Sequence, residues 1–332
     1  MALVEEKVDY TKDILDILEI LRKKEIAAKQ PFKAKAYATV AKNIVLLGKP
    51  VTSIDDLEGV KGIGEKIRLK IEELFATGKV QAAENANNDE NNIIAMNLMN
   101  IHGIGPTKAK SLIEEHGIKT IEQLELNQTL LNDKQKIGLK YWKDFQLRIP
   151  RAEIDKHYEL LAQIINSIDK DFEFQITGSY RRLEPTSGDI DILITHKNDP
   201  ENVEELFKSV VDRLKKDKYI TDVFAEGGKK CLAVCKLKRH KTFRRIDLLY
   251  TNKKEYPFAV LYFTGDAAFN VSMRHYCLGK GLSLSEHGIK DEKSGEFVDT
   301  NVENEKDIFE YIGLEYVEPQ NRKNTMVKPI QS

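Results

Sequence analysis

The hydrophobic pattern changes its period near Pro150, and this change constrains the fold more than any other feature of the 332-residue sequence. Before Pro150, apolar residues recur at helical spacing, as Ile14, Leu18 and Leu21 do. After a further helix over residues 154–168, the runs FEFQIT, DIDILIT, CLAVCKL and RRIDLLY alternate with a period of two, which is typical of strands. We therefore expect an all-α first half and an α+β second half.

Helix and linker signals divide the chain further. The spacing predicts helices over residues 8–29, 34–47 and 64–76, more helices within 93–147, and two late helices around 269–279 and 305–312. The segment AENANNDENN, residues 83–92, is Asn-rich and aperiodic, which indicates a mobile linker or a loop at a helix end. The polar tail NRKNTMVKPIQS is expected to fray. The expected domain boundaries are 1–86, a linker at 87–92, 93–147, 148–257 and 258–332.

Charge and cysteine usage narrow the class of protein. The 52 Lys and Arg residues nearly balance the 53 Asp and Glu residues, so the net charge of −1 does not identify a nucleic-acid partner. The stretch from Arg22 to Lys79 differs, because thirteen basic residues face seven acidic ones there, which suits a phosphate backbone. Cys231, Cys235 and Cys277 lack the spacing of a metal site, so we expect reduced thiols in the core.

The sequence shows neither a signal peptide nor a membrane-spanning segment. The start MALVEEKVDY is too acidic and has too short an apolar stretch for a signal peptide. No window approaches the ~18 apolar residues that a membrane span needs. These features predict a soluble, intracellular protein without a membrane partner.

A short glycine repeat opens two of the expected helices. The copies are VKGIG, which contains Gly62 and Gly64, and IHGIG, which contains Gly103 and Gly105. Glycines permit a tight turn, and the helix that follows presents unpaired N–H groups and its positive dipole end to a phosphate. One copy alone could be a plain helix–helix turn. Two copies favour paired helix-hairpin-helix units that hold a DNA backbone without reading its sequence.

Two aspartates of the run SGDIDIL are expected to share one face of a strand. Side chains alternate along a strand, so Asp189 and Asp191 point one way while Ile190 and Ile192 point into an apolar layer. Their spacing along the strand is ~7 Å, so their charges repel unless a cation compensates them. Carboxylate oxygens are the ligands that Mg²⁺ prefers.

A third carboxylate completes the predicted metal site. Asp247 alternates with Ile246 and Leu248 in the run RRIDLL, so it also lies on the polar face of a buried strand. Three carboxylates can hold two divalent ions about 3.5–4 Å apart, an arrangement that serves phosphoryl displacement. The alternative is three solvated aspartates at strand edges.

Gly178 and Ser179 are expected at a turn between a strand and a helix. The backbone N–H groups of this turn, the Ser179 hydroxyl and the Arg182 guanidinium could grip two phosphates of a nucleotide. The Gly-Ser pair is a weak signal alone. Its ten-residue distance from Ser179 to Asp189 makes the prediction specific.

These motifs together resemble the X family of DNA polymerases, which includes DNA polymerase beta, over residues 8–323. The resemblance rests on Gly178-Ser179, Asp189-x-Asp191, Asp247, the run LYFTG at 261–265 and both glycine hairpins. It implies a helical lyase-like domain, a helical DNA-binding subdomain, an α+β nucleotidyltransferase palm and a small α+β nucleotide-selection subdomain, in that order along the expected boundaries.

The resemblance also implies roles for individual residues. Asp189 and Asp191 would bind both metals, and Asp247 would bind the catalytic metal and accept the primer's proton. The triphosphate would be held by Arg148, Ser179, Arg182, Ser187 and Gly188. Tyr262 and Phe263 would line the sugar, Asn270 would contact the base, Arg274 would reach the template strand, and Arg245 would pair near Asp247.

A second site is implied in the N-terminal domain. Lys70 matches the lysine that forms a Schiff base with the 5′-deoxyribose phosphate, while Lys33 and Lys66 match residues that bind the 5′-phosphate and Tyr37 matches a supporting aromatic. The alternative for Lys70 is a surface lysine on a DNA-facing helix. Five positions depart from the family pattern without removing a metal ligand or this lysine: Phe32, Ala82, Leu249, Ala267 and Val271.

The expected function is a template-directed DNA polymerase that fills short gaps in base excision repair and also has 5′-deoxyribose phosphate lyase activity. One alternative is a polymerase whose N-terminal domain binds DNA without lyase turnover, and another is a non-enzymatic or RNA-directed relative. The expected cofactors are two Mg²⁺ ions, with Mn²⁺ as a substitute, and a monovalent cation at each hairpin. The expected partners are gapped or nicked DNA, deoxynucleoside triphosphates and repair proteins such as a DNA ligase. We expect a monomer in a nucleus or a viral DNA-replication compartment.

Overall fold

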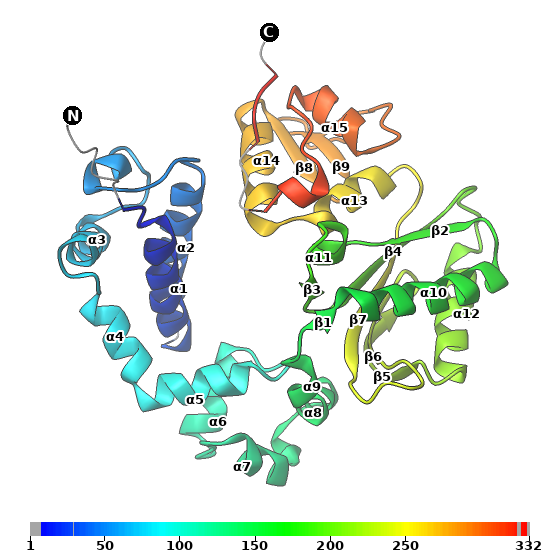
Figure 1. The fold of residues 1–332 in the computed structure, drawn as a ribbon, viewed down its shortest axis with the longest axis horizontal. Helices are drawn as coiled ribbons and strands as arrows, with labels where there is room; N and C mark the ends of the chain where they lie inside the picture. The colour runs from blue at the N-terminus through cyan, green and yellow to red at the C-terminus, as the bar shows by residue number, and fades with distance from the viewer. Residues whose placement is uncertain (1–7, 29, 324–326, 331–332) are drawn as a thin grey trace. The chain divides into compact units, whose positions relative to one another are not determined.

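The computed structural model describes residues 8–28, 30–323 and 327–330. The chain divides into two compact units, residues 1–139 and 140–332 (Figure 1). The first is helical and the second is built on a five-stranded sheet. The predicted multi-domain layout, helical first and α+β second, is confirmed.

The first unit is made of short helices, and residues between Ile14 and Ala83 form one core within it. In α1 the expected face is buried, with Ile14, Leu18 and Leu21 at most 2% exposed. Pro31 starts the second helix at its first position, where a missing N–H costs nothing. The helices are α1 Thr11–Ala27, α2 Pro31–Val45, η1 Ile54–Leu57, α3 Glu65–Thr77, α4 Gln81–Asn88, α5 Glu90–Met99, α6 Pro106–Glu114, α7 Ile121–Leu126, η2 Gln128–Leu130 and α8 Asp133–Lys140.

The prediction of an irregular mobile linker at residues 83–92 was wrong. Two helices, α4 and α5, cover the segment and break only at Asp89. The Asp89 carboxylate accepts the Asn92 N–H and so caps α5. The segment is helical because Ala83 and Ala86 are buried within the unit, and this burial outweighs the weak helix propensity of asparagine. The domain boundary placed here stays a prediction.

The second unit is organised by a sheet with the strand order β2-β4-β7-β6-β5. Only β4 and β7 pair in parallel, whereas the other neighbours are antiparallel. The helices α10 and α12 cover one face (Figure 1). The elements of this part are α9 Trp142–Phe145, β1 Ile149–Pro150, α10 Arg151–Ile168, β2 Phe172–Ile176, α11 Gly178–Arg181, β3 Thr186–Ser187, β4 Ile190–His196, α12 Val203–Lys216, β5 Ile220–Gly227, β6 Lys230–Cys235 and β7 Arg244–Tyr250.

Strand alternation sorts the two faces of the sheet as expected. Ile190, Ile192 and Ile194 of β4 join Ile246 and Leu248 of β7 in the core beneath α10 and α12. Cysteine burial follows the same rule: the thiols of β6 and of the later helix α14 are free and buried, which confirms that they are core residues. The opposite face therefore receives the odd-numbered side chains of both strands.

That opposite face carries α13, which connects the sheet to the last part of the chain. Leu193 of β4 packs with Ala259 and Val260 of α13, and Leu249 of β7 joins them. A second core, built around Phe269, Met273 and Phe309, holds the remaining elements together. These are α13 Tyr256–Thr264, α14 Ala267–Gly279, β8 Leu282–Ser285, β9 Gly288–Asp291, α15 Glu305–Ile312 and η3 Pro319–Asn321.

The described end of the tail is paired, although fraying was expected. Leu314 and Pro329 form an antiparallel bridge, and the Ile330 N–H donates to the Gly313 carbonyl at 3.1 Å. Val327 packs against the core of this last part. Tertiary contacts therefore fix a polar segment whose composition alone predicts no structure.

Candidate functional site

Two of the three expected carboxylates lie side by side on the sheet. Asp191 of β4 and Asp247 of β7 are direct partners in the parallel pairing. Neighbouring strands run ~4.8 Å apart, so the two side chains emerge together on the face away from α10 and α12. Asp189 lies just before β4 and forms an ion pair with Arg245. Arg245 was expected to pair near Asp247, and its charge also acts on that carboxylate.

The electrostatics of these acids reflect crowding in a poorly solvated place. Burial raises the pKa of Asp191 to about 7, and the charges of Asp189 and Asp247 push it in the same direction. Burial also raises the pKa of Asp247, again helped by Asp189, while Arg245 opposes the change. The carboxylates therefore resist ionising together unless positive charge is added.

The donor set fits a hard divalent cation. It consists of half-buried carboxylate oxygens that repel one another, which is the environment that Mg²⁺ relieves. The three acids are not drawn around one point, because Asp189 turns toward Arg245. Asp189, Asp191 and Asp247 would hold the ions.

A different acidic cluster does have its ligand atoms close together. Among the described residues, the oxygens of Asp169 and Asp171 and a ring nitrogen of His196 lie within 4.8 Å of one another. The His196 Nδ1 accepts the Asn198 N–H at 3.1 Å, so the proton of the neutral ring is on Nε2. That nitrogen faces Asp169 at 3.5 Å. The cluster joins the segment between α10 and β2 to the end of β4, and the buried His196 Nε2 makes no hydrogen bond within the described residues. Sequence reasoning did not single it out.

Gly178 fits against the metal-binding face for two reasons. Its φ of +57° lies in the left-handed region, and a Cβ built there would meet the Asp191 Oδ2 at 2.8 Å. The turn after β2 therefore needs a glycine to approach the carboxylate. Ser179 follows in α11 and donates from its hydroxyl to the Ser187 Oγ at 2.9 Å.

The remaining triphosphate residues border the same turn. Arg148 donates to the Thr186 carbonyl at 2.7 Å, and its Nη1 lies 3.3 Å from a Cβ built on Gly188. Arg182 donates from Nη1 to the Thr264 carbonyl at 2.6 Å. It pairs from Nη2 with Glu184 at 3.2 Å. Arg182 thus joins the turn to the end of α13.

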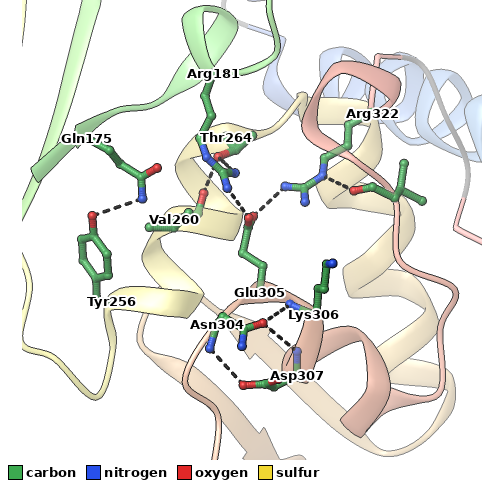
Figure 2. A network of polar contacts seen from close by, with 11 residues as sticks. Gln175, Arg181, Tyr256, Val260, Thr264, Asn304, Glu305, Lys306, Asp307 and Arg322 are labelled. Carbon is green, nitrogen blue, oxygen red and sulfur yellow. Dashed lines mark hydrogen bonds and ion pairs between the residues drawn. The ribbon is translucent and has the colours of Figure 1, made fainter. Parts of the chain in front are cut away.

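A buried ion cluster joins the same turn to the end of the chain (Figure 2). Glu305, at the start of α15, accepts from Arg181 with one oxygen and from Arg322 at 2.7 Å with the other. The side chain of Arg322 is fully buried and that of Glu305 is 6% exposed. Arg181 also donates to the Thr264 hydroxyl at 2.8 Å, so both arginines of the turn contact Thr264.

The expected sugar and base residues contact one another across α13 and α14. The Tyr262 and Phe263 rings meet edge to face at 5.1 Å. The Asn270 side-chain amide donates to the Tyr262 carbonyl at 2.8 Å. The Arg274 guanidinium stacks over the Tyr262 ring at 4.7 Å and pairs with Glu286. A nucleotide would have to displace these internal contacts.

The two glycine hairpins have the same backbone geometry. Gly62 and Gly103 are left-handed, with φ of +96° and +88°. Gly64 and Gly105 then cap α3 and α6 with φ, ψ of −85°, 170° and −90°, 176°. The two five-residue glycine motifs therefore share a backbone conformation as well as a sequence pattern. The geometry leaves the first N–H groups of both helices available to an anion.

Comparisons with known proteins agree along almost the whole chain. The DNA polymerase beta palm model matches residues 148–253, the DNA polymerase beta thumb model matches 259–323, and the fingers domain of DNA polymerase lambda matches 96–146. A helix-hairpin-helix domain matches 9–80, and a tandem helix-hairpin-helix model matches 54–115. The chain belongs to the X family of DNA polymerases.

Curated X-family relatives align with the chain at moderate identity. DNA polymerase lambda of Rattus norvegicus is 31% identical over 96% of this chain and 57% of its own length. DNA polymerase lambda of Arabidopsis thaliana is 29% identical over 82% and 54%. DNA nucleotidylexotransferase of Xenopus laevis is 27% identical over 95% and 68%. The chain therefore spans between 54% and 68% of the length of these relatives.

The residues expected for a lyase step lie in the first unit of this X-family chain. Lys70 lines a small apolar cavity with residues of α1 and α3, and its Nζ donates to the Lys66 carbonyl at 3.0 Å. Lys33 lies 4.0 Å from Glu25. Burial raises the pKa of Tyr37, and the Glu25 charge adds to the effect.

Among the described helices, none is long and apolar enough to cross a membrane.

Sequence reasoning missed several residues that hold the X-family site. The contacts of Thr264 and Glu305 with the turn were not predicted, because their partners lie far away in sequence. Gly138 did give a sequence signal, because a glycine destabilises the interior of a helix and usually has a packing or functional role there. A Cβ built there would lie 2.0 Å from the His102 carbonyl oxygen, so α8 packs directly on the second hairpin.

Proposed function

We propose that this chain is a DNA-directed DNA polymerase that fills short gaps during base excision repair and also removes a 5′-deoxyribose phosphate. One observation carries the polymerase part: Asp191 and Asp247 are partners on neighbouring parallel strands, beside a glycine turn that contacts Asp191. X-family membership is consistent with it. The five segments set out from the sequence are proposed as its domains.

Two divalent ions, held by Asp189, Asp191 and Asp247, would activate the primer 3′-hydroxyl and neutralise the departing pyrophosphate. The primer oxygen forms a bond to the α-phosphorus while the bond from that phosphorus to the bridging oxygen breaks. Asp247 accepts the hydroxyl proton on a carboxylate oxygen. Its raised pKa suits this role, since a stronger base takes the proton more readily.

The turn between β2 and β4 binds the triphosphate in this proposal. Arg148 and Arg182 supply positive charge, and the Ser179 and Ser187 hydroxyls supply hydrogen bonds. Gly188 lets the backbone approach, because its missing side chain leaves room beside Arg148. These groups orient the leaving group in line with the attacking oxygen.

The helices α13 and α14 select the nucleotide. The backbone at Tyr262 and Phe263 lies along the sugar and excludes a 2′-hydroxyl. Asn270 contacts the minor-groove edge of the base, and Arg274 reaches the template strand after it leaves Glu286. Arg245 forms an ion pair with Asp189 beside the other two carboxylates.

The glycine hairpins bind gapped or nicked duplex DNA through its phosphates. Gly62 and Gly64 would contact one side of the gap, and Gly103 and Gly105 the other, with a monovalent cation at each. Such contacts are independent of base sequence. The matching geometry of both hairpins supports this assignment.

The lyase step uses Lys70 as the nucleophile. Its amine attacks the sugar aldehyde, water leaves as the imine forms, and β-elimination then expels the 5′-phosphate. The stem of Lys70 lines a small apolar cavity beside α1, and the attack itself requires an unprotonated amine. Lys33, Lys66 and Tyr37 would bind the phosphate. Borohydride trapping should fail in Lys70→Ala while gap filling continues; trapping that survives would identify a different nucleophile.

The polymerase proposal is tested by primer extension on a one-nucleotide gap, with and without a 5′-phosphate and with Mg²⁺ or Mn²⁺ added or withheld. Asp247→Ala should abolish nucleotide addition and leave gapped-DNA binding within about tenfold, because the hairpins carry that affinity. Unchanged incorporation would refute the assigned role. We place the protein in a nucleus or a viral replication compartment, acting as a monomer beside repair proteins such as a DNA ligase.

A further inference from the structure

The C-terminal tail returns to the proposed triphosphate turn through one lysine. Lys323 donates from Nζ to the Glu184 Oε2 at 3.1 Å. The other oxygen of Glu184 accepts from Arg182 at 3.2 Å. One carboxylate is therefore shared by a triphosphate-binding arginine and by a residue more than a hundred positions later in the chain.

The tail is anchored on both sides of this lysine. Arg322, directly before it, is buried and donates to the Val317 carbonyl at 2.9 Å as well as to Glu305. Farther along, the Val327 N–H donates to the Ser272 hydroxyl at 3.1 Å. Buried Arg322 thus places the residue that follows it, Lys323, beside the turn.

Glu184 is an anion in a place that must accept a more highly charged anion. Its side chain is 18% exposed. Burial pushes the pKa of Glu184 upward, but hydrogen bonds from Lys323 and Arg182 outweigh it and keep the pKa below its usual value. The carboxylate stays ionised at neutral pH, where it competes with phosphate for Arg182 and repels it.

We propose that Lys323 is a positioning residue for the incoming triphosphate, which it favours by neutralising Glu184 beside Arg182. This inference rests on the proposed polymerase function. With Lys323 in place, the two cations and one anion leave one net positive charge for the phosphates. Without it, Arg182 and Glu184 cancel, and both oxygens of Glu184 are available to hold the arginine.

Loss of the Lys323 charge should weaken nucleotide binding without changing the rate of the chemical step. Lys323 pairs with Glu184, which is not one of the three carboxylates assigned to the metals, so its loss should leave the reacting atoms unchanged. Lys323→Met should raise the KM for the deoxynucleotide about two- to fivefold, the range expected for a partly exposed charge pair, with an unchanged kcat. Lys323→Arg should restore the normal KM because it retains the charge.

The test is a double-mutant cycle with Glu184→Gln, measured by single-nucleotide gap filling. Lys323→Met should have its effect in the wild-type background and almost none in the Glu184→Gln background, because no anion is left to neutralise. Lys328→Met is the matched control, since it removes an exposed lysine from the same tail. Equal effects in both backgrounds, or a lower kcat at constant KM, would overturn the proposal.

A binding measurement separates this inference from the proposed function. Deoxynucleotide and Mg²⁺ are titrated onto gapped DNA with a dideoxy-terminated primer, so that no chemistry occurs. Weaker binding in Lys323→Met together with no incorporation by the wild-type chain would keep the inference and sink the polymerase proposal. Normal incorporation with identical binding in both proteins would do the reverse.

Discussion

Removal of Glu305 should destabilise the last part of the chain far more than its single charge suggests. Glu305→Ala leaves Arg322 buried without a counter-charge, since its other neighbours are the Val317 carbonyl and the rings of Phe269, Phe309 and Tyr316. Breaking a buried ion pair from one side costs about 3–5 kcal/mol. The arm to Arg181 adds little, because that side chain is 22% exposed and can be hydrated.

Hydrogen exchange of peptides from α14 and α15 is the suitable assay, because a chain of two units need not unfold in one step. A loss of about 3–5 kcal/mol should speed exchange there by roughly two to four orders of magnitude, at about 1.4 kcal/mol per tenfold. Glu305→Gln, which keeps the shape and one acceptor, should give a smaller increase. The peptides of β6 and α1 should not change.

Glu310→Gln is the control for this experiment, since Glu310 is an exposed carboxylate on the same helix. We expect it to change the opening free energy by less than about 0.5 kcal/mol. Exchange in Glu305→Ala that matches Glu310→Gln would refute the reasoning, because it would mean that Arg322 needs no counter-charge where it lies.

Three further results are expected. The pKa of Asp191 is about 7 in the folded chain without metal, against an ordinary value of 3.8. Between pH 3.8 and pH 7 the folded chain therefore binds more protons than the unfolded chain. Its free energy of unfolding should fall as the pH rises through this range. Asp191→Asn should remove this slope in urea titrations and stabilise the metal-free chain at pH 8 by about 2–4 kcal/mol; parallel curves would contradict it. Gly178→Ala should lower kcat at least about tenfold, because the added Cβ displaces the Asp191 carboxylate. Gly281→Ala is the control, since Gly281 has a φ of +72° but open space around it, so that this variant carries only the backbone strain. Equal kcat values in the two variants would be evidence against the contact between Gly178 and Asp191. Gly138→Ala should weaken gapped-DNA binding in filter or anisotropy assays by pushing α8 off the second hairpin, and unchanged affinity would show that the hairpin tolerates the shift.

The parts of the fold that sequence predicts are those with a local period. The alternation around Asp191 and Asp247 predicts their common face because side-chain direction in a strand depends only on position. The glycine repeats predict helix starts for a similar reason, since a left-handed φ is a local demand.

The parts that sequence does not predict depend on distant partners. The helix over Ala83 and Ala86 forms because of burial, which a local composition count does not register. The ion pair of Arg245 with Asp189 likewise depends on how the strands pack, which a local sequence pattern does not register. The pairing of the tail was not predicted for the same reason, because the Gly313 carbonyl that accepts the Ile330 N–H belongs to another segment.

The parallel alignment of β4 and β7 restricts where this chain can change its length. One residue added to or removed from either strand ahead of Asp191 or Asp247 would rotate that acid into the apolar layer under α10 and α12. The connection from β4 to β7, by contrast, can grow or shrink in its loops while both strands keep their phase. Insertions in descendants of this sequence should therefore collect in those loops, and the two short strands should keep a constant length.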